Sequence, residues 1–176
     1  MKEELDRNTL LSMDDDELSR CCEFEFFKGS GPGGQHRNKV SSAVRVKLAA
    51  FGISAADCSE RTQHRNRANA LAKLRHTMAI EIRQPVSLPD DDGKTGDAGG
   101  IGSDIPFECS IRNPRYYLFI AILLDRLEAA GFDQRKAAEM YGVSPSALIR
   151  KISADPSLWT HCLRRRNQLG LPAWRK

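Results

Sequence analysis

Apolar and polar residues alternate in two segments of the first third of the chain, and this alternation predicts two β-strands. In residues 22–26 Cys and Phe alternate with two glutamates, and in residues 44–48 Val and Leu alternate with two basic residues. Side chains in a strand point alternately to its two faces, so each segment presents one apolar face to a core. A weaker pattern over residues 52–57 predicts a third, short strand.

After these strands the apolar residues recur at helical spacing. The recurring residues are Leu71, Leu74, Met78 and Ile82. They predict an amphipathic helix of about 20 residues that begins near Ser59, which is expected to cap it, and that has a basic outer face. A shorter helix is expected over residues 13–20, where Ser12 and Asp15 form a candidate capping box.

The last third of the chain has the pattern of four helices. Residues 116–130 are apolar nearly all round and predict a buried helix that Gly131 ends. A short helix over residues 133–141, a turn at residues 142–143, a helix opening at Ser144-Pro145 and a helix after Asp155-Pro156 are expected to follow. The acidic, glycine-rich residues 85–105 predict a flexible linker before these helices.

The chain has a net charge of +4, but its acidic and basic residues are concentrated in different segments. The net charge is −6 in residues 1–27, +8 in 28–83, −5 in 84–108 and +7 in 109–176. Two basic blocks predict two modules that each face a polyanion, although two solvated basic surfaces would give the same composition.

Composition excludes several classes of protein. The longest apolar run, residues 116–124, is much shorter than the about 20 residues of a membrane-spanning helix, so no membrane partner is expected. The N-terminal residues lack the apolar segment of a secretory signal. The five cysteines are scattered without a C-x-x-C pair, which predicts reduced thiols in the cytoplasm and no four-cysteine zinc site. Cys58 and His64 are too few to indicate a metal site, and we expect neither a metal nor another cofactor.

A glycine-rich segment follows the first predicted strand and fits two known phosphate-binding loops poorly. Gly29, Gly31 and Gly34 match the dinucleotide-binding pattern, but the residues that follow are basic and polar rather than an apolar helix. The nucleotide-hydrolysing loop requires Lys and then Ser or Thr where this chain has Gln35 and His36. Neither dinucleotide binding nor nucleotide hydrolysis is therefore a favoured interpretation of this segment.

The same segment closely resembles the signature loop of the class I peptide chain release factors. Residues 30–41 read Ser-Gly-Pro-Gly-Gly-Gln-His-Arg-Asn-Lys-Val-Ser, and the resemblance continues through residues 42–46 and 59–67. Together it covers roughly residues 20–83 and is greatest for the small, codon-independent rescue hydrolases of that superfamily. It implies hydrolysis of the ester that joins a nascent peptide to tRNA, within the ribosome and without stop-codon reading.

The resemblance also implies which residues carry the reaction. Gly33 and Gly34 would shape the turn, the main-chain N–H of Gln35 would donate to the oxyanion, and its side chain would help to place the attacking water. Residues for binding RNA would be His36, Arg37, Asn38, Lys39, Arg61, Arg65 and Arg67. For each of the first four, the alternative is a solvated cap on the next element. For each of the last three taken singly, an exposed helix charge is an equally good interpretation.

The predicted C-terminal helices depart from that family. Ala138, Gly142 and Leu148 resemble the contact positions of a helix-turn-helix of the DNA-binding kind. The basic residues of this part expected to bind RNA are Arg150, Lys151, Arg164, Arg165 and Arg166. The module would dock on ribosomal RNA or mRNA, but a helical bundle that binds protein or only stabilises the fold would show the same pattern.

These observations together predict an α+β domain at residues 10–84, a small mixed β-sheet with a long helix packed against it. The linker at 85–105 and a helical, helix-turn-helix-like domain at 106–176 would follow. The predicted activity is that of a cytoplasmic, monomeric peptidyl-tRNA hydrolase, whose partners are the ribosome, peptidyl-tRNA and mRNA. The alternative is a non-enzymatic regulator that binds nucleic acid through the helix-turn-helix and uses its N-terminal domain as an anchor on RNA or the ribosome.

Overall fold

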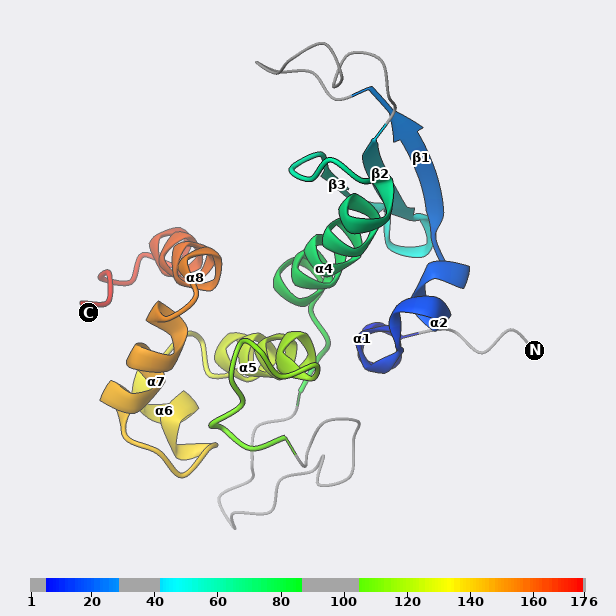
Figure 1. The fold of residues 1–176 in the computed structure, drawn as a ribbon. Helices are drawn as coiled ribbons and strands as arrows, with labels where there is room; N and C mark the ends of the chain where they lie inside the picture. Colours follow the sequence, from blue (N-terminus) through cyan, green and yellow to red (C-terminus); the bar gives the residue numbers. More distant parts are fainter. Residues whose placement is uncertain (1–5, 29–41, 87–104, 176) are drawn as a thin grey trace. The chain divides into compact units, whose positions relative to one another are not determined.

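The structure, a computed structural model, describes residues 6–28, 42–86 and 105–175 (Figure 1). The chain divides into two compact units, residues 1–81 (unit 1) and residues 82–176 (unit 2). The predicted α+β fold is confirmed. The predicted linker at 85–105 falls mostly outside the described residues, so its boundaries stay a prediction.

Among the described residues of unit 1, three strands form a sheet in the order β1-β2-β3, namely β1 (Glu23–Phe27), β2 (Ala43–Leu48) and β3 (Ile53–Asp57). Both strand pairs are antiparallel, so the expectation of a mixed sheet is wrong. The reason is the connection between β2 and β3, which has only residues 49–52 and is too short for the crossover that parallel strands need. It holds the one-turn helix η1 (Ala49–Phe51) and Gly52, whose φ of 64° suits glycine.

Helix α4 (Gln63–Glu81) lies across one face of this sheet (Figure 1). Val44 and Val46 are fully buried on the sheet, and Leu74 and Met78 are fully buried on the helix. The predicted long helix is therefore confirmed, but Ser59 does not cap it. Instead the Thr62 hydroxyl accepts a hydrogen bond from the Arg65 N–H at 3.4 Å, since Ser59 donates its own hydroxyl to Asp57.

Two short helices, α1 (Arg7–Ser12) and α2 (Asp15–Arg20), precede the sheet. The capping box of α2 is formed by Asp14 and Glu17, so the expected box of Ser12 and Asp15 is wrong. Ser12 is the last residue of α1, and its hydroxyl donates to the Asn8 carbonyl instead. Three leucines bury these helices in unit 1, where both contact α4: Leu10, Leu11 and Leu18.

Asp57 ties the end of β3 to α4 through a buried carboxylate. It accepts hydrogen bonds from the Ser59 hydroxyl at 2.7 Å and the Ser59 N–H at 3.0 Å, and Lys73 Nζ lies 2.6 Å from its other oxygen. Burial alone would raise the pKa of Asp57, but the bonds from Lys73 and Ser59 outweigh it and lower the pKa from 3.8 to about 2. Because the folded-state pKa lies below the unfolded one, this stabilisation is present above pH 4 and is lost as the pH falls toward 2.

The variant Asp57→Asn is therefore expected to lower the free energy of unfolding of unit 1 by about 2 kcal/mol near neutral pH. The difference from the wild type should shrink as the pH falls from about 4 to about 2. All Trp and Tyr residues lie at or beyond residue 116, so unit 1 is best followed by amide hydrogen exchange in β2 and α4. A difference that stays constant over this pH range would contradict the assignment.

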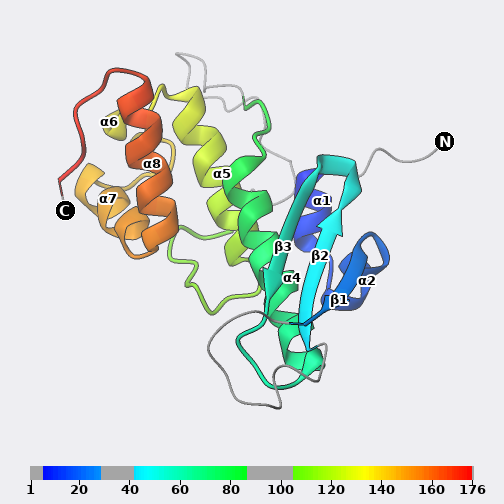
Figure 2. The same cartoon turned by 90° about the horizontal axis from the view of Figure 1, so that it is seen from above.

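The described residues of unit 2 form four helices, α5 (Tyr116–Ala129), α6 (Gln134–Glu139), α7 (Pro145–Ser153) and α8 (Pro156–Gln168) (Figure 2). Their order and starting points confirm the predicted helices. Asp133, Ser144 and Asp155 cap α6, α7 and α8 with their side chains. The buried Tyr116 hydroxyl on α5 also donates to Asp155 at 3.0 Å, and this bond joins the first helix of the unit to the last.

Two general features of the described residues bear on function. None of their helices combines the length and apolarity that crossing a membrane requires. None of the five cysteines forms a disulfide, and burial raises the pKa of Cys162 to about 12, so this thiol stays protonated at neutral pH.

Candidate nucleic-acid interface

The glycine-rich segment singled out in the sequence begins and ends at two paired strands. Gly33, Gly34 and Gln35 lie outside the described residues, as do the four predicted RNA-binding residues His36, Arg37, Asn38 and Lys39. The strands on either side are described, and Phe27 of β1 pairs with Ala43 of β2. The chain therefore leaves the sheet and returns to it at neighbouring positions.

The buried side chain of Asn66 joins the return point to the start of α4. Its Nδ2 donates to the Ser42 carbonyl at 2.7 Å and to the Glu60 carbonyl at 3.0 Å, while its Oδ1 accepts from the Glu60 N–H at 2.8 Å. Two carbonyls and one N–H fix the orientation of the amide, because only Nδ2 can donate and only Oδ1 can accept. The start of α4 is thereby held beside Ser42, the first described residue after the glycine-rich segment.

Three predicted RNA-binding arginines are exposed at this end of unit 1. Arg61 precedes α4, and Arg65 and Arg67 lie in its first turns. Arg65 forms an exposed ion pair with Glu60 at 3.5 Å. The Arg67 guanidinium lies 4.1 Å from the ring centroid of Phe24 on β1, a cation–π contact that orients it over the sheet.

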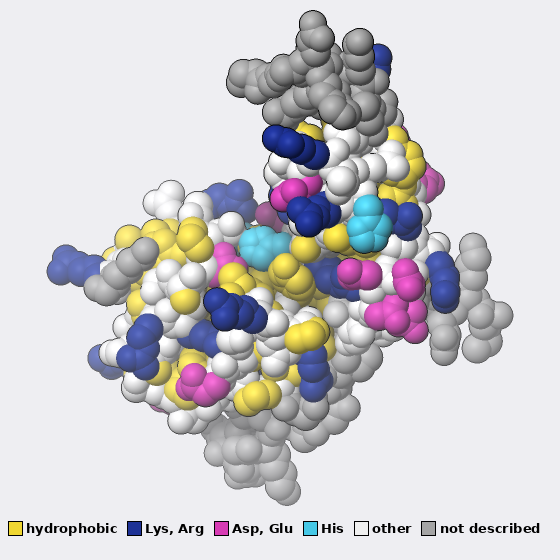
Figure 3. Space-filling model, viewed as in Figure 1, with side chains coloured by type: hydrophobic (Ala, Val, Ile, Leu, Met, Phe, Trp, Pro, Cys, Tyr) yellow, Lys and Arg dark blue, Asp and Glu magenta, His cyan; other side chains and the backbone are white. Residues whose placement is uncertain are grey.

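Acidic side chains interrupt the positive charge of unit 1. Glu25 on β1 pairs with both Arg45, at 3.2 Å, and Lys47 on β2, and Asp57 pairs with Lys73. On the face shown in Figure 3, Lys and Arg side chains lie beside Asp and Glu side chains rather than in one uninterrupted basic patch. A polyanion bound to unit 1 would therefore contact individual Lys and Arg side chains rather than one continuous positive surface.

The predicted basic residues of unit 2 fall into two groups. Arg150 on α7 and Arg164 on α8 are exposed. Lys151, which is expected to bind RNA, donates to the Cys109 carbonyl, and its Nζ lies 5.1 Å from the Phe119 ring centroid, so it packs inside the unit instead. Arg165, half-buried, pairs with Glu128 on α5, an interaction that raises the pKa of Arg165.

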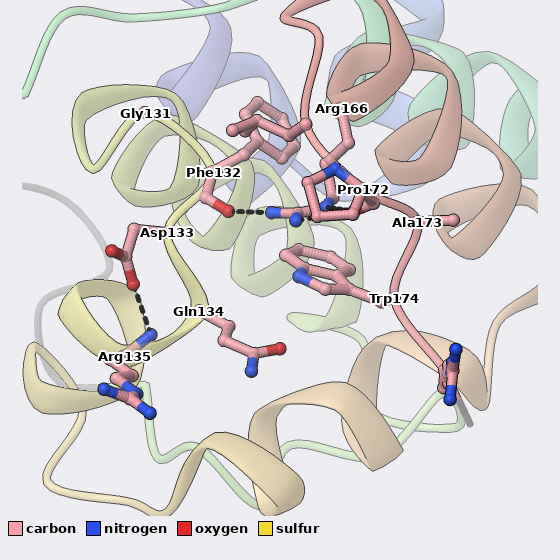
Figure 4. A pocket seen from close by; sticks show the side chains of 11 residues that line it. Gly131, Phe132, Asp133, Gln134, Arg135, Arg166, Pro172, Ala173 and Trp174 are labelled. Atoms are coloured by element: carbon pink, nitrogen blue, oxygen red, sulfur yellow. Dashed lines mark hydrogen bonds between the residues drawn. The ribbon is translucent and has the colours of Figure 1, made fainter.

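Arg166 is buried beside a cavity of about 640 Å³ in unit 2 (Figure 4). Its guanidinium donates to the Phe132 carbonyl and, at 2.7 and 2.9 Å, to the Pro172 carbonyl, and it lies 4.7 Å from the Trp174 ring centroid. The segment after α8 is thus fastened to the turn after α5. Arg166 acts as a structural residue here, and its bonds occupy the guanidinium that an RNA phosphate would need.

The expected helix-turn-helix contacts occur between α6 and α7. Ala138 on α6 and Leu148 on α7 are fully buried, and Gly142 in the turn has a φ of 62°. A small residue, a left-handed turn residue and an apolar residue at these places allow the two helices to pack closely. Ser144 and Ser146 at the start of α7 are exposed, as is Arg150, about one turn after Ser146.

Sequence reasoning missed the residues that position this interface. Asn66 lies in residues 59–67, which carry part of the family resemblance, but the sequence gives it no role of its own. An asparagine is unfavourable inside a helix, and this is the signal that points to a specific bond. No group of three or more candidate metal-ligating side chains comes together within the described parts of the chain.

Comparison with known proteins assigns a family to the first half of the chain. A family model described as the RF-1 domain matches residues 11–102, more than half of the chain. The chain is 45% identical over 71 residues to a peptide chain release factor homolog of Escherichia coli, which covers 40% of this chain and 34% of that protein. It is 39% identical over 77 residues to peptide chain release factor 2 of Paramagnetospirillum magneticum, covering 42% and 21% of the two chains.

A third relative is similar over a shorter stretch. Peptide chain release factor 1 of Acidiphilium cryptum is 51% identical over 59 residues, covering 34% of this chain and 17% of its own. The chain thus spans about a third of the length of the first relative and about a fifth of the other two.

Proposed function

The chain belongs to the RF-1 domain family of the class I peptide chain release factor superfamily, and on this premise we propose that it hydrolyses the ester bond of peptidyl-tRNA on the ribosome. Water attacks the ester carbonyl, a tetrahedral oxyanion forms, and the terminal ribose oxygen of the tRNA leaves. In our proposal the Gln35 main-chain N–H donates to that oxyanion, and its side chain orients the water. Gly33 and Gly34 allow the main chain to approach the RNA closely.

One structural observation carries this proposal beyond family membership. The hydrogen bonds of Asn66 hold the start of α4 beside Ser42, so that Arg61, Arg65 and Arg67 share one end of unit 1 with the base of the glycine-rich segment. Exposed arginines next to a catalytic segment can bind the phosphates around the reaction centre. We propose that His36, Arg37, Asn38 and Lys39 contact RNA from the segment itself.

We further propose that the chain acts on stalled ribosomes without reading a stop codon. Beyond the matched residues 11–102, the described residues 105–175 form the helices of unit 2. We assign this unit to docking on ribosomal RNA or mRNA through exposed cations such as Arg150 and Arg164. The other predicted cations of unit 2 make the internal contacts described above: Lys151, Arg165 and Arg166. In our proposal these contacts stabilise the packing of the helices that carry the docking surface.

Release from defined stalled ribosomes tests this proposal. Ribosomes carrying labelled peptidyl-tRNA are prepared on mRNA that ends at the P site, on mRNA that extends beyond it without a stop codon, and on mRNA with a stop codon in the A site. The expected result is rapid release of labelled peptide on the truncated mRNA. Release that requires a stop codon would contradict the codon-independent part, and no release on any of these ribosomes would contradict the hydrolase itself.

The packing of α6 against α7 favours a second candidate function. A regulator that binds duplex DNA through α7 would use the same buried Ala138 and Leu148 and the exposed Arg150. It would bind DNA with a sequence preference and an affinity that falls steeply with salt. Gel-shift titrations of the full chain against random duplex DNA and against ribosomes separate the two functions.

A further inference from the structure

The cavity of about 640 Å³ in unit 2 takes no part in the function proposed above. It lies between the turn that joins α5 to α6 and the segment that follows α8 (Figure 4). Its volume falls within the range of about 300–1,000 Å³ that is usual for small-molecule sites. Apolar side chains such as Phe132 and Leu171 line it together with several polar ones, so it suits a ligand that has both apolar and polar parts.

One polar group of this lining is buried without a hydrogen-bond partner. Trp174 is 7% exposed, and its indole Nε1–H has no partner among the described residues. Figure 4 shows this nitrogen on the side of the ring that faces the Gln134 side chain. A buried donor without a partner costs free energy, and an indole N–H can donate but not accept. The cavity is therefore complementary to a ligand that places an acceptor at this point.

The cavity also has an excess of positive charge. Three arginines and one aspartate line it, which gives a net charge of +2: Arg135, Arg166, Arg175 and Asp133. Arg166 donates to main-chain carbonyls, and within the described parts of the chain no carboxylate forms an ion pair with it. Burial accordingly lowers the pKa of Arg166. Because a buried charge is costly unless it is compensated, an anion in this cavity would be stabilised.

The other two arginines are available to bind that anion. Arg135 on α6 and Arg175 after α8 are exposed at the rim, and neither forms an ion pair with another described residue. A guanidinium binds a phosphate through two parallel hydrogen bonds. Gln134 lies between Arg135 and Trp174 in Figure 4, and its amide can both donate and accept, as the edge of a nucleobase does.

We propose that this cavity is a nucleotide-binding site. The edge of the base points inward, where it accepts from Trp174 Nε1–H and pairs with the Gln134 amide, and the phosphate lies at the rim beside Arg135 and Arg175. The nucleotide is either free or part of a single RNA strand, and the experiment distinguishes these two sources. The choice of a nucleotide rests in part on the proposed function, in which unit 2 docks on RNA.

Binding to the full chain is followed by NMR through the indole N–H signals. The chain has two tryptophans and so two such signals, which the variant Trp174→Phe assigns. The probes are AMP and a short single-stranded RNA, with adenosine and inorganic phosphate as partial ligands. AMP and the RNA are expected to shift the Trp174 signal downfield in a saturable way, and adenosine should bind about 10-fold more weakly than AMP. RNA that binds at least about 10-fold more tightly than AMP identifies a strand as the ligand, and a smaller difference identifies the free nucleotide.

Arg135→Gln and Lys136→Gln form a matched pair of variants. Lys136 is the exposed neighbour on the same helix and is not among the residues that line the cavity. In titration calorimetry Arg135→Gln should weaken AMP binding about 10-fold, whereas Lys136→Gln should weaken it less than about 2-fold. Trp174→Phe keeps a ring but loses the N–H, and should weaken binding about 5-fold. The Arg135 comparison holds even if Trp174→Phe does not fold.

Three results would overturn the proposal. The first is a Trp174 signal that no probe shifts, because water alone would then bond the indole. The second is inorganic phosphate that shifts the signal as strongly as AMP, and the third is an equal loss of affinity in Arg135→Gln and Lys136→Gln. The experiment uses no ribosome, so a chain that binds AMP but releases no peptide keeps the site and refutes the hydrolase. A chain that releases peptide but binds no probe keeps the hydrolase and refutes the site.

Discussion

Replacing Gln35 with alanine is expected to slow peptide release about 100-fold while the affinity for ribosomes stays unchanged. In the proposed mechanism the glutamine amide orients the attacking water, since it can both donate and accept a hydrogen bond while carrying no charge. Alanine keeps the main-chain N–H and removes only this orientation, a loss of positioning of about that size. Single-turnover release at saturating protein measures the effect on the chemical step alone.

A matched control for this variant is Gln168→Ala. Gln168 is an exposed glutamine at the end of α8, and its side chain accepts a hydrogen bond from the neighbouring Arg165 side chain at 3.0 Å. It should release peptide at the wild-type rate. Ribosome binding by both variants, measured by co-sedimentation, should match the wild type. An unchanged single-turnover rate for Gln35→Ala would show that the side chain takes no part in catalysis.

Replacing Arg166 with methionine is expected to lower the free energy of unfolding of unit 2 by about 3 kcal/mol. Methionine keeps most of the apolar stem of arginine but none of its donors, so the Phe132 and Pro172 carbonyls lose their hydrogen bonds from Arg166. It also removes the cation from the face of Trp174. Urea unfolding followed by tryptophan fluorescence measures this directly, because Trp159 and Trp174, the only tryptophans, both lie in unit 2.

The control for Arg166→Met is Arg164→Met on the same helix. Arg164 is exposed, and its contact with His161, at 3.4 Å, is local to α8. A surface change of this kind is expected to alter stability by less than about 0.5 kcal/mol. If Arg166→Met were as stable as Arg164→Met, then Arg166 would not be the structural residue described above and would be available to bind RNA.

Local sequence signals predicted the helices of unit 2 well. Asp133, Ser144 and Asp155 each precede a helix and cap it with their own side chains. Each capping residue and the main-chain N–H that it binds therefore lie within three residues of each other in the sequence. Helix α1 was missed because it is short and its Leu10 and Leu11 are buried in unit 1, where α1 contacts α4, more than fifty residues away in sequence. Such a helix depends on tertiary packing, which periodicity cannot reveal.

In the candidate interface, too, the sequence shows the residue types but not the contacts between residues that lie far apart in the sequence. The sequence identified basic residues but could not separate Arg150, which is exposed, from Lys151, which packs inside unit 2. The carbonyl that Lys151 bonds belongs to Cys109, forty-two residues earlier. Asn66 is similar, since the carbonyl of its partner Ser42 comes close only when α4 packs on the sheet. The sequence shows which residues are charged, but only the fold decides which group each charged side chain contacts.

The central claim of the proposed mechanism is that one main-chain N–H, that of Gln35, stabilises the oxyanion during peptide release. Replacing the peptide bond between Gly34 and Gln35 by an ester in a semisynthetic full chain removes this single donor and keeps both side chains. Loss of one oxyanion donor typically costs about 10²–10³ in rate. Single-turnover release slowed by that factor, with ribosome binding unchanged, is the predicted result, and release at the wild-type rate would contradict the account.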